Sequence, residues 1–288
     1  MVISIDQKKN YPMARFMYAL TPLTRRMRAR FAHRAHAFLT SDYLARKIEA
    51  ILFEHLEAVR LDPTVIVDAG SGPGRMLPAL RQRFPTAQHV LIDSSMEVLG
   101  LAQDWRPWRK PKRICADLRS IPLLNQSVEL VLSNLALNAV SHDLKAAFSS
   151  FARIQPPDGL LAFSMLGPAS LRELRQPEQI SPFPDMHDVG DAMVAAGYAD
   201  VVMDCERLTI EYQNPGALLA EASALSLTGP PFHSMKKTST KRLHRALEQQ
   251  LAASDGGPVS LTLEVTFGHG WVPRSRTSQD VMLSFPAS

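Results

Sequence analysis

The chain has 288 residues, 45% of them apolar, and a formal net charge of +4. This length and apolar content exclude an intrinsically disordered protein and favour one large domain with attachments. Its two cysteines, Cys115 and Cys205, exclude a disulfide framework and a cysteine-based zinc site, so we expect a cytoplasmic protein.

Membrane and metal signals are weak along the whole chain. No eighteen consecutive residues are apolar, and the first ten lack the apolar run of a signal peptide, so we expect no membrane partner. His33 and His36, three apart on a basic helix, could ligate a metal, but no third ligand stands nearby. We therefore expect no metal site.

The positive charge gathers in clusters within 12–40, 105–113 and 236–245. Such clusters favour acidic partners. The cluster from Trp105 to Arg113 interleaves aromatic and basic residues, as surfaces that bind single-stranded nucleic acid do. Its two prolines and its place between strands favour a solvated loop instead, and we expect no nucleic-acid partner.

The predicted elements begin with an amphipathic helix from Thr40 to Arg60, whose apolar residues recur at three- and four-residue steps. Val65–Val67 follow as a buried parallel strand, and a helix is expected near Met76–Arg83. The alternation then repeats, with strands at 89–93, 114–117, 128–133 and 159–166 and helices at 96–103 and 144–154. This rhythm predicts an α/β fold with a parallel sheet covered on both faces.

The chain beyond Gly167 continues the pattern, with a helix at 189–196 and strands at 201–212 and 260–267. Helical patterns between the last two strands predict a helical insertion over about 214–257. We expect an N-terminal basic helical cap over 1–60 and a ligand-binding domain over 61–288.

A glycine-rich turn follows the first predicted strand. Its glycines, Gly70, Gly72 and Gly74, let the backbone turn sharply and approach a ligand without Cβ obstruction. Arg75 replaces the last glycine of a dinucleotide fingerprint, and no P-loop Lys-Ser/Thr follows. Asp68 would repel a phosphate but suits a ligand with a cationic amino-acid end, such as S-adenosylmethionine. A turn that only packs a helix against a strand is the alternative.

Two further acids end the next two predicted strands. Asp93 stands 23 positions after Gly70, about where such folds place an acid on the ribose hydroxyls, and we assign Ser94 beside it to the same ligand. Asp117 is placed to accept from the adenine amino group, with the Leu118 N–H at the ring. Each acid alone could be a turn or capping residue. Three carboxylates ending successive parallel strands meet in one crevice, so together they predict S-adenosylmethionine binding.

Six segments extend this pattern over most of the chain: Arg30–Phe38, Asp117–Leu123, Ser133–Leu137, Phe163–Arg175, Met186–Asp191 and Gly268–Pro273. They resemble class I S-adenosylmethionine-dependent methyltransferases, and more narrowly the malonyl-acyl-carrier-protein O-methyltransferases of biotin synthesis and the related mitochondrial complex I assembly factors. The resemblance implies a Rossmann-like fold: a mostly parallel seven-stranded sheet with helices on both faces, an N-terminal helical cap and a helical insertion before the last strand.

The resemblance also implies a reaction, methylation of the free carboxylate of a malonyl thioester on acyl carrier protein. A carboxylate is already ionised at neutral pH, so we assign no general base. An acyl carrier protein is acidic, so the N-terminal arginines and the Lys236–Arg245 helix would form its docking surface. A merely solubilising surface is an equal alternative for these basic residues.

The sequence departs from the family at the substrate end. Asn138-Ala139 stands where the family has Gln or His followed by Trp, and Phe38 stands where it has Tyr. We assign Phe38 and Asn138 to the substrate and Asn134 to the cofactor, with helix capping as the alternative for both asparagines. Two other functions stay open: an assembly or modifying factor of methyltransferase fold without methyl transfer, and a methyltransferase for a different small molecule.

Overall fold

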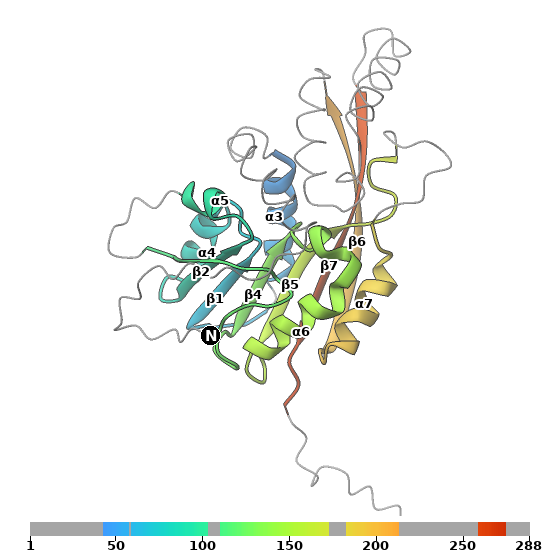
Figure 1. Ribbon diagram of the computed structural model, residues 1–288. Coiled ribbons are helices and arrows are strands. Elements are labelled where there is room, and N and C mark those ends of the chain that lie inside the picture. Colours follow the sequence, from blue (N-terminus) through green and yellow to red (C-terminus); the bar gives the residue numbers. More distant parts are fainter. Residues whose placement is uncertain (1–42, 58, 103–109, 173–182, 213–258, 275–288) are drawn as a thin grey trace, which may run out of the picture.

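The computed structural model describes residues 43–57, 59–102, 110–172, 183–212 and 259–274. Within these segments seven strands form one sheet, in the order β3-β2-β1-β4-β5-β7-β6 (Figure 1). The strands are β1 Val65–Ala69, β2 Gln88–Asp93, β3 Lys112–Cys115, β4 Leu130–Asn134, β5 Leu160–Leu166, β6 Ala199–Tyr212 and β7 Val259–Trp271. The helices are α3 Tyr43–His55, α4 Leu77–Arg83, α5 Met96–Gly100, the 3₁₀ helix η2 Leu137–Asp143, α6 Leu144–Ile154 and α7 Met186–Ala195.

The sheet is parallel except for one strand. β1 pairs in parallel with β2 and β4, and β2–β3 and β4–β5 are also parallel pairs. β7 runs antiparallel to both β5 and β6. This confirms the predicted mostly parallel seven-stranded sheet. The carboxyl ends of β1, β2 and β4 therefore share one edge, where open α/β sheets bind their ligands.

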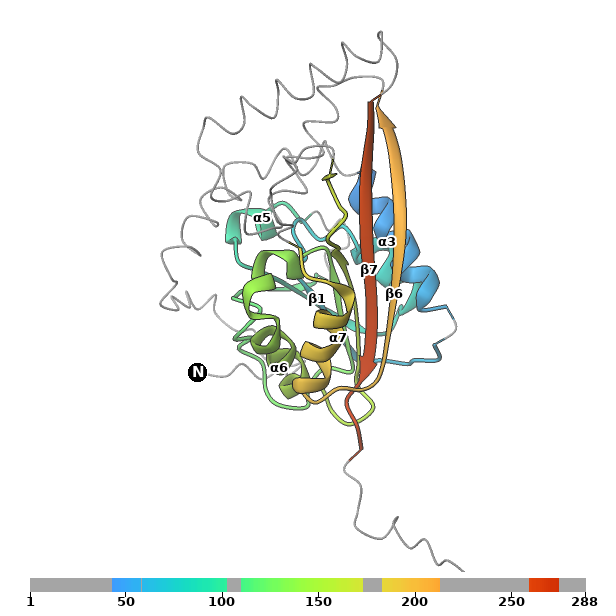
Figure 2. The same ribbon diagram turned by 90° about the vertical axis from the view of Figure 1, so that its right-hand side faces the viewer.

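Helices cover both faces of the sheet (Figure 2). On one face, Leu44, Ile48 and Leu52 of α3 and Leu80 of α4 are buried in a cluster with strand residues. These α3 positions recur at three- and four-residue steps, as an amphipathic helix requires. α3 therefore belongs to the same core as the sheet, although it was predicted within an N-terminal cap.

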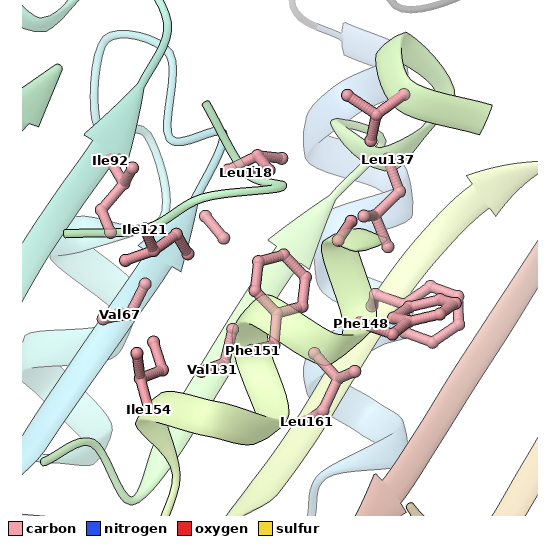
Figure 3. Close-up of a cluster of buried hydrophobic side chains, with 14 of the residues drawn as sticks. Val67, Ile92, Leu118, Ile121, Val131, Leu137, Phe148, Phe151, Ile154 and Leu161 are labelled. Carbon is pink, nitrogen blue, oxygen red and sulfur yellow. The ribbon is translucent and has the colours of Figure 1, made fainter. Parts of the chain in front are cut away.

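The other face is covered by α6 and α7. Figure 3 shows Phe151 and Ile154 of α6 facing strands of the sheet, among side chains that include Val131 of β4. Phe148 and Phe151 are fully buried, and burial of each such side chain stabilises the fold by about 1.5–3 kcal/mol. This packing joins α6 and the sheet in one apolar cluster.

β3 and α5 are among the predicted elements that are shorter in the structure. β3 ends at Cys115 rather than Asp117, because the Asp117 carbonyl accepts from Ser120 N–H and closes a turn. α5 ends at Gly100 rather than Gln103, and Ser95 caps its start by accepting from Val98 N–H at 3.3 Å. Gln103 itself lies outside the described residues.

The β6–β7 hairpin is longer than the sequence pattern indicates. β5 pairs with β7 only over Val265–Trp271, whereas β6 pairs with β7 along its whole length to Val259. The hairpin therefore extends past the carboxyl end of β5 (Figure 2). The predicted insertion at 214–257 and most of the predicted cap lie outside the described residues, so the domain boundaries stay predictions. Among the residues described, no helix has the length and apolarity to cross a bilayer.

Candidate active site

The glycine-rich turn after β1 satisfies its own backbone. The N–H groups of Gly70 and Ser71 both donate to the carbonyl of Ile92, at 2.7 and 2.9 Å. Gly72 N–H donates to Oδ2 of Asp93 at 3.0 Å, and Gly74 N–H donates to the Ser71 carbonyl at 2.9 Å. An anion site at such a turn needs free N–H groups, and these are already engaged. The turn is therefore not a phosphate cradle, as its sequence predicts.

The three glycines of the turn serve different purposes. All three have positive φ, 78° at Gly70, 54° at Gly72 and 72° at Gly74, which other residues rarely adopt. A Cβ at Gly70 would lie 2.0 Å from Cβ of Ala136, and one at Gly74 would lie 2.9 Å from Leu91. A Cβ at Gly72 would meet no atom of the described residues within 4 Å. Gly70 and Gly74 thus permit close packing, whereas no described residue limits the space at Gly72.

Asp68, next to last in β1, is the most unusual acid of the site. Its side chain is 2% exposed, and neither carboxylate oxygen has a hydrogen-bond partner among the described residues. Burial, and then the charges of Glu49 and Asp93, raise the pKa of Asp68 well above its ordinary value. A buried carboxylate without a partner is energetically costly. A cationic group bound here would relieve that cost.

Glu49 is a second acid at this place, and the sequence analysis missed it. It lies half-buried on α3, one position after the fully buried Ile48. Burial raises the pKa of Glu49 to about 7, although the charge of Arg46 lowers it. The signal in the sequence was an acid beside the apolar stripe of the helix. Glu49 and Asp68 together favour a cation.

Asp93 ends β2 and braces the turn. Its Oδ1 accepts from Ser95 N–H at 2.9 Å and its Oδ2 accepts from Gly72 N–H at 3.0 Å. Burial raises its pKa against the lowering effect of these hydrogen bonds. Hydrogen bonds from the backbone and the side chain of Ser94 also lower this pKa, so a ribose hydroxyl bound here would share the carboxylate with these donors. Ser94 stands beside it, and the Ser94 carbonyl accepts from the Cys115 thiol at 3.4 Å.

Asp117 differs from the other two acids because it has a cationic partner. Its carboxylate accepts from Arg119 at three donors: the backbone N–H at 2.9 Å, Nε at 3.0 Å and Nη2 at 2.6 Å. Burial raises its pKa, but the hydrogen bonds and charge of Arg119 outweigh burial and lower it. The predicted contact with an adenine amino group would compete with Arg119. Leu118 is 8% exposed and lies close to Gly70, which brings the β3 loop beside the turn.

The two asparagines predicted for the site form hydrogen bonds to neighbouring elements of the fold. Asn134 Nδ2 donates to the Ala45 carbonyl of α3 at 3.0 Å, and its Oδ1 accepts from the Ser164 hydroxyl at 2.6 Å. Asn138 is fully buried, and its Oδ1 accepts from Leu166 N–H at 3.1 Å rather than capping a helix. Direct ligand contacts by these side chains stay predictions. Phe38 lies outside the described residues.

The arrangement fits S-adenosylmethionine. The unpartnered carboxylate of Asp68, with Glu49 near it, suits the ammonium end of the ligand. The carboxylate of Asp93 beside the turn suits ribose hydroxyls, and no described residue closes over Gly72, which leaves room for the ligand. The turn offers no free N–H group to a phosphate.

Comparison with known proteins agrees with this fit. A family model described as a methyltransferase domain matches residues 67–163. The malonyl-[acyl-carrier protein] O-methyltransferase of Gallionella capsiferriformans is 34% identical over 272 residues, covering 88% of this chain and 92% of the relative. The protein of the same name from Laribacter hongkongensis is 33% identical over 271 residues, covering 87% and 90%.

Solved structures share the fold at low sequence identity. Phosphoethanolamine N-methyltransferase 2 of Haemonchus contortus, in complex with S-adenosyl-L-methionine, has a TM-score of 0.57 at 13% identity and covers 90% of this chain and 62% of its own. Geranyl diphosphate C-methyltransferase of Streptomyces coelicolor, in complex with S-adenosyl-L-homocysteine, has a TM-score of 0.54 at 14% identity and covers 89% and 100%. The predicted Rossmann-like methyltransferase fold is thereby confirmed.

Proposed function

Because this chain belongs to the malonyl-[acyl-carrier protein] O-methyltransferase family, whose enzymes depend on S-adenosylmethionine, we propose that it methylates the free carboxylate of a malonyl thioester on acyl carrier protein, in biotin synthesis. The observation that carries the choice of acceptor is the likeness to these relatives along 88% of the chain. The buried, unpartnered Asp68 beside a turn without free N–H groups supports the choice of methyl donor.

The reaction asks the protein for alignment more than for proton transfer. When bound, S-adenosylmethionine supplies an electrophilic methyl group on a sulfonium with a neutral thioether as leaving group. The acceptor carboxylate is ionised at neutral pH, so no side chain has to remove a proton. The products are a methyl ester and S-adenosylhomocysteine. The contribution of the chain is to fix two reactants in line and to exclude water.

Three residues of the site would hold the methyl donor. Asp68 would bind its ammonium group, Asp93 would accept from its ribose hydroxyls, and Gly72 would let it approach the backbone. Asn134 braces the end of β4 against α3, and Asn138 braces η2 against β5, so both support a rigid site beside the turn.

The acyl carrier protein is the proposed protein partner, and basic residues would guide it. Complementary charge speeds encounter and fixes orientation. Reversal of Arg26 and Arg28 to Glu should slow carrier association and leave S-adenosylmethionine affinity unchanged, as surface plasmon resonance and calorimetry would measure. Unchanged association kinetics would remove the N-terminal arginines from the docking surface.

A transfer assay tests the proposed reaction directly. Purified protein, methyl-labelled S-adenosylmethionine and malonyl-acyl carrier protein should give a labelled carrier whose malonyl group gains one methyl ester by mass spectrometry. Acetyl-acyl carrier protein is the matched control, because it lacks the free carboxylate. Expression should also restore growth without biotin to an auxotroph that lacks the methyltransferase.

The two alternative functions predict different results in these assays. Cofactor binding without transfer to the malonyl carrier, and without growth of the auxotroph, would contradict the proposal and favour an assembly factor. Transfer to a free small-molecule carboxylate but not to the carrier would favour a methyltransferase of different substrate range.

A further inference from the structure

A histidine and two acids from distant parts of the chain meet at the β6 edge of the sheet. His55 is the last residue of α3, and Asp204 and Glu206 lie two residues apart on β6, so both acids share one face of the strand. Nε2 of His55 lies 3.6 Å from Oδ2 of Asp204 and 3.8 Å from Oε1 of Glu206. One ligand atom from each of the three residues lies within 4.8 Å of the other two.

These separations suit a shared ion better than a hydrogen bond. A hydrogen bond between nitrogen and oxygen has a distance of about 2.7–3.2 Å, and both distances from His55 exceed it. Two ligands bonded to one Zn²⁺ at about 2.0–2.2 Å and a tetrahedral angle stand about 3.4 Å apart. Small rotations of the two carboxylates would therefore bring all three atoms onto one ion.

The imidazole of His55 is held in place by its packing. Its ring meets the ring of Phe267 edge to face, with centroids 4.8 Å apart and an interplanar angle of 72°. Phe267 is 2% exposed and stands opposite Asp204 in the β6–β7 register. Packing thus fixes the ring of His55 beside the strand that carries both acids. Such fixed ligands favour metal binding, because less side-chain freedom is lost when the ion binds.

The cluster is reachable from solvent and has a second imidazole in its neighbourhood. The side chains of His55, Asp204 and Glu206 are 27%, 59% and 37% exposed, which leaves room for an ion with water ligands. His269 follows two residues after Phe267 on β7, so both side chains share one face of that strand.

We propose that His55, Asp204 and Glu206 form a binding site for a divalent transition-metal ion of the zinc type. One imidazole with two carboxylates suits Zn²⁺, Co²⁺ or Ni²⁺ better than Mg²⁺, which prefers oxygen ligands alone. The strands β4, β5 and β7 separate this site from the turn after β1, so it does not rest on the proposed function. A bound ion would tie the end of α3 to the edge strand of the sheet.

Metal titration of the full chain without an affinity tag tests this site. Zn²⁺ should bind with one ion per chain in calorimetry and should raise the melting temperature, since a ligand of the native state stabilises it. His55→Ala and Asp204→Asn should each weaken this binding at least tenfold. The matched control is His187→Ala, because His187 is an exposed histidine paired with Asp185 on another element, and it should keep full binding.

Further measurements decide the ligand set and the class of ion. Co²⁺ should give visible d–d absorption that is lost in His55→Ala, without the near-ultraviolet thiolate band that ligation by Cys205 would add. Zn²⁺ binding that persists in both His55→Ala and Asp204→Asn would overturn the site. Equal stabilisation by Mg²⁺ and Zn²⁺ would overturn the assignment to a transition metal.

Discussion

One edge of the sheet carries acids at the ends of β1 and β2 and in the loop after β3. The acid of β1 and the acid after β3 differ in their hydrogen bonding. Asp68 is buried without a hydrogen-bond partner in the described part of the chain, whereas Asp117 is bonded to Arg119 at distances down to 2.6 Å. Sequence position predicts where a carboxylate lies. Its neighbours decide whether it is available to a ligand, and by that measure the β1 end is the stronger binding region.

The pKa shifts express the same contrast with opposite signs. The pKa of Asp68 is raised, so the empty protein favours its protonated form and loses stability as pH rises. The pKa of Asp117 is lowered, so its pair with Arg119 stabilises the fold at neutral pH and loses that effect as pH falls below the ordinary value of 3.8. A bound cation would offset the cost of burying the charge of Asp68, whereas at Asp117 it would compete with Arg119.

Asp68→Asn should have the largest effect on the β1 region. Loss of the charge-assisted bond to the cofactor ammonium should weaken S-adenosylmethionine binding by about 2–3 kcal/mol. The ligand-free protein should become more stable at pH 8, because an amide avoids the burial and the repulsion by Glu49 and Asp93 that penalise an ionised carboxyl group here. Calorimetry measures the affinity, and thermal unfolding measures the stability. Asp62→Asn, at an exposed acid just before β1, is the control. If ligand-free Asp68→Asn melted at a lower temperature than the wild type, ionisation of Asp68 would not destabilise the empty protein, and this interpretation would be wrong.

Asp93→Ala should weaken cofactor binding by about 1–3 kcal/mol, through loss of the ribose acceptor. In contrast to Asp68→Asn, it should also destabilise the ligand-free protein, because the N–H groups of Gly72 and Ser95 lose their acceptor. Asp93→Asn keeps one acceptor oxygen and should lie between wild type and Asp93→Ala in both measurements. Unchanged affinity in Asp93→Ala would show that the ribose is bound elsewhere.

Much of this comparison could be predicted from the sequence. The alternation of strand and helix predicts the parallel sheet, and the spacing of Asp68, Gly70 and Asp93 places the turn and both acids at one edge. Those inferences depend on local periodicity and on the fixed geometry of parallel strands. The predicted helix at 144–154 matches α6 for the same reason, because its apolar positions define most of the buried face, where Ser150 is the polar exception.

The partners of each acid could not be predicted, because they come from other parts of the chain or from side-chain orientation. Glu49 approaches Asp68 only because α3 packs on the sheet. Arg119 stands two residues after Asp117, but no spacing rule says whether it turns back to bind that acid or extends to solvent. Asn134 likewise could be assigned to the site by position, while its bonds to Ala45 and Ser164 depend on tertiary packing.

The affinity for S-adenosylmethionine should depend on pH through the β1 region. Burial raises the pKa of Glu49 to about 7, so the empty protein holds a proton there that a cationic ligand would displace. The α-amino group of the ligand stays mostly protonated below about pH 7.7. Affinity should therefore rise between pH 5.5 and 7, by up to about tenfold per unit for each released proton. Calorimetry in buffers of different ionisation enthalpy counts that proton, and Glu49→Gln should reduce both the slope and the count. An S-adenosylmethionine affinity that does not change with pH in the wild type would show that Glu49 does not interact with the cofactor.

Asp117→Ala should have the smallest effect, because Arg119 already occupies the carboxylate. We expect S-adenosylmethionine affinity to fall by less than about 1 kcal/mol, which a shared acceptor would give. Arg119→Ala is the informative partner: it frees the Asp117 carboxylate, so affinity should rise if the adenine amino group binds there and should stay constant if it does not. The double variant removes both groups and should match Asp117→Ala if Arg119 acts only through Asp117. A loss in Asp117→Ala as large as that in Asp93→Ala would mean that Arg119 leaves the acid when the cofactor binds, and the contrast between the two regions would then hold for the empty protein alone.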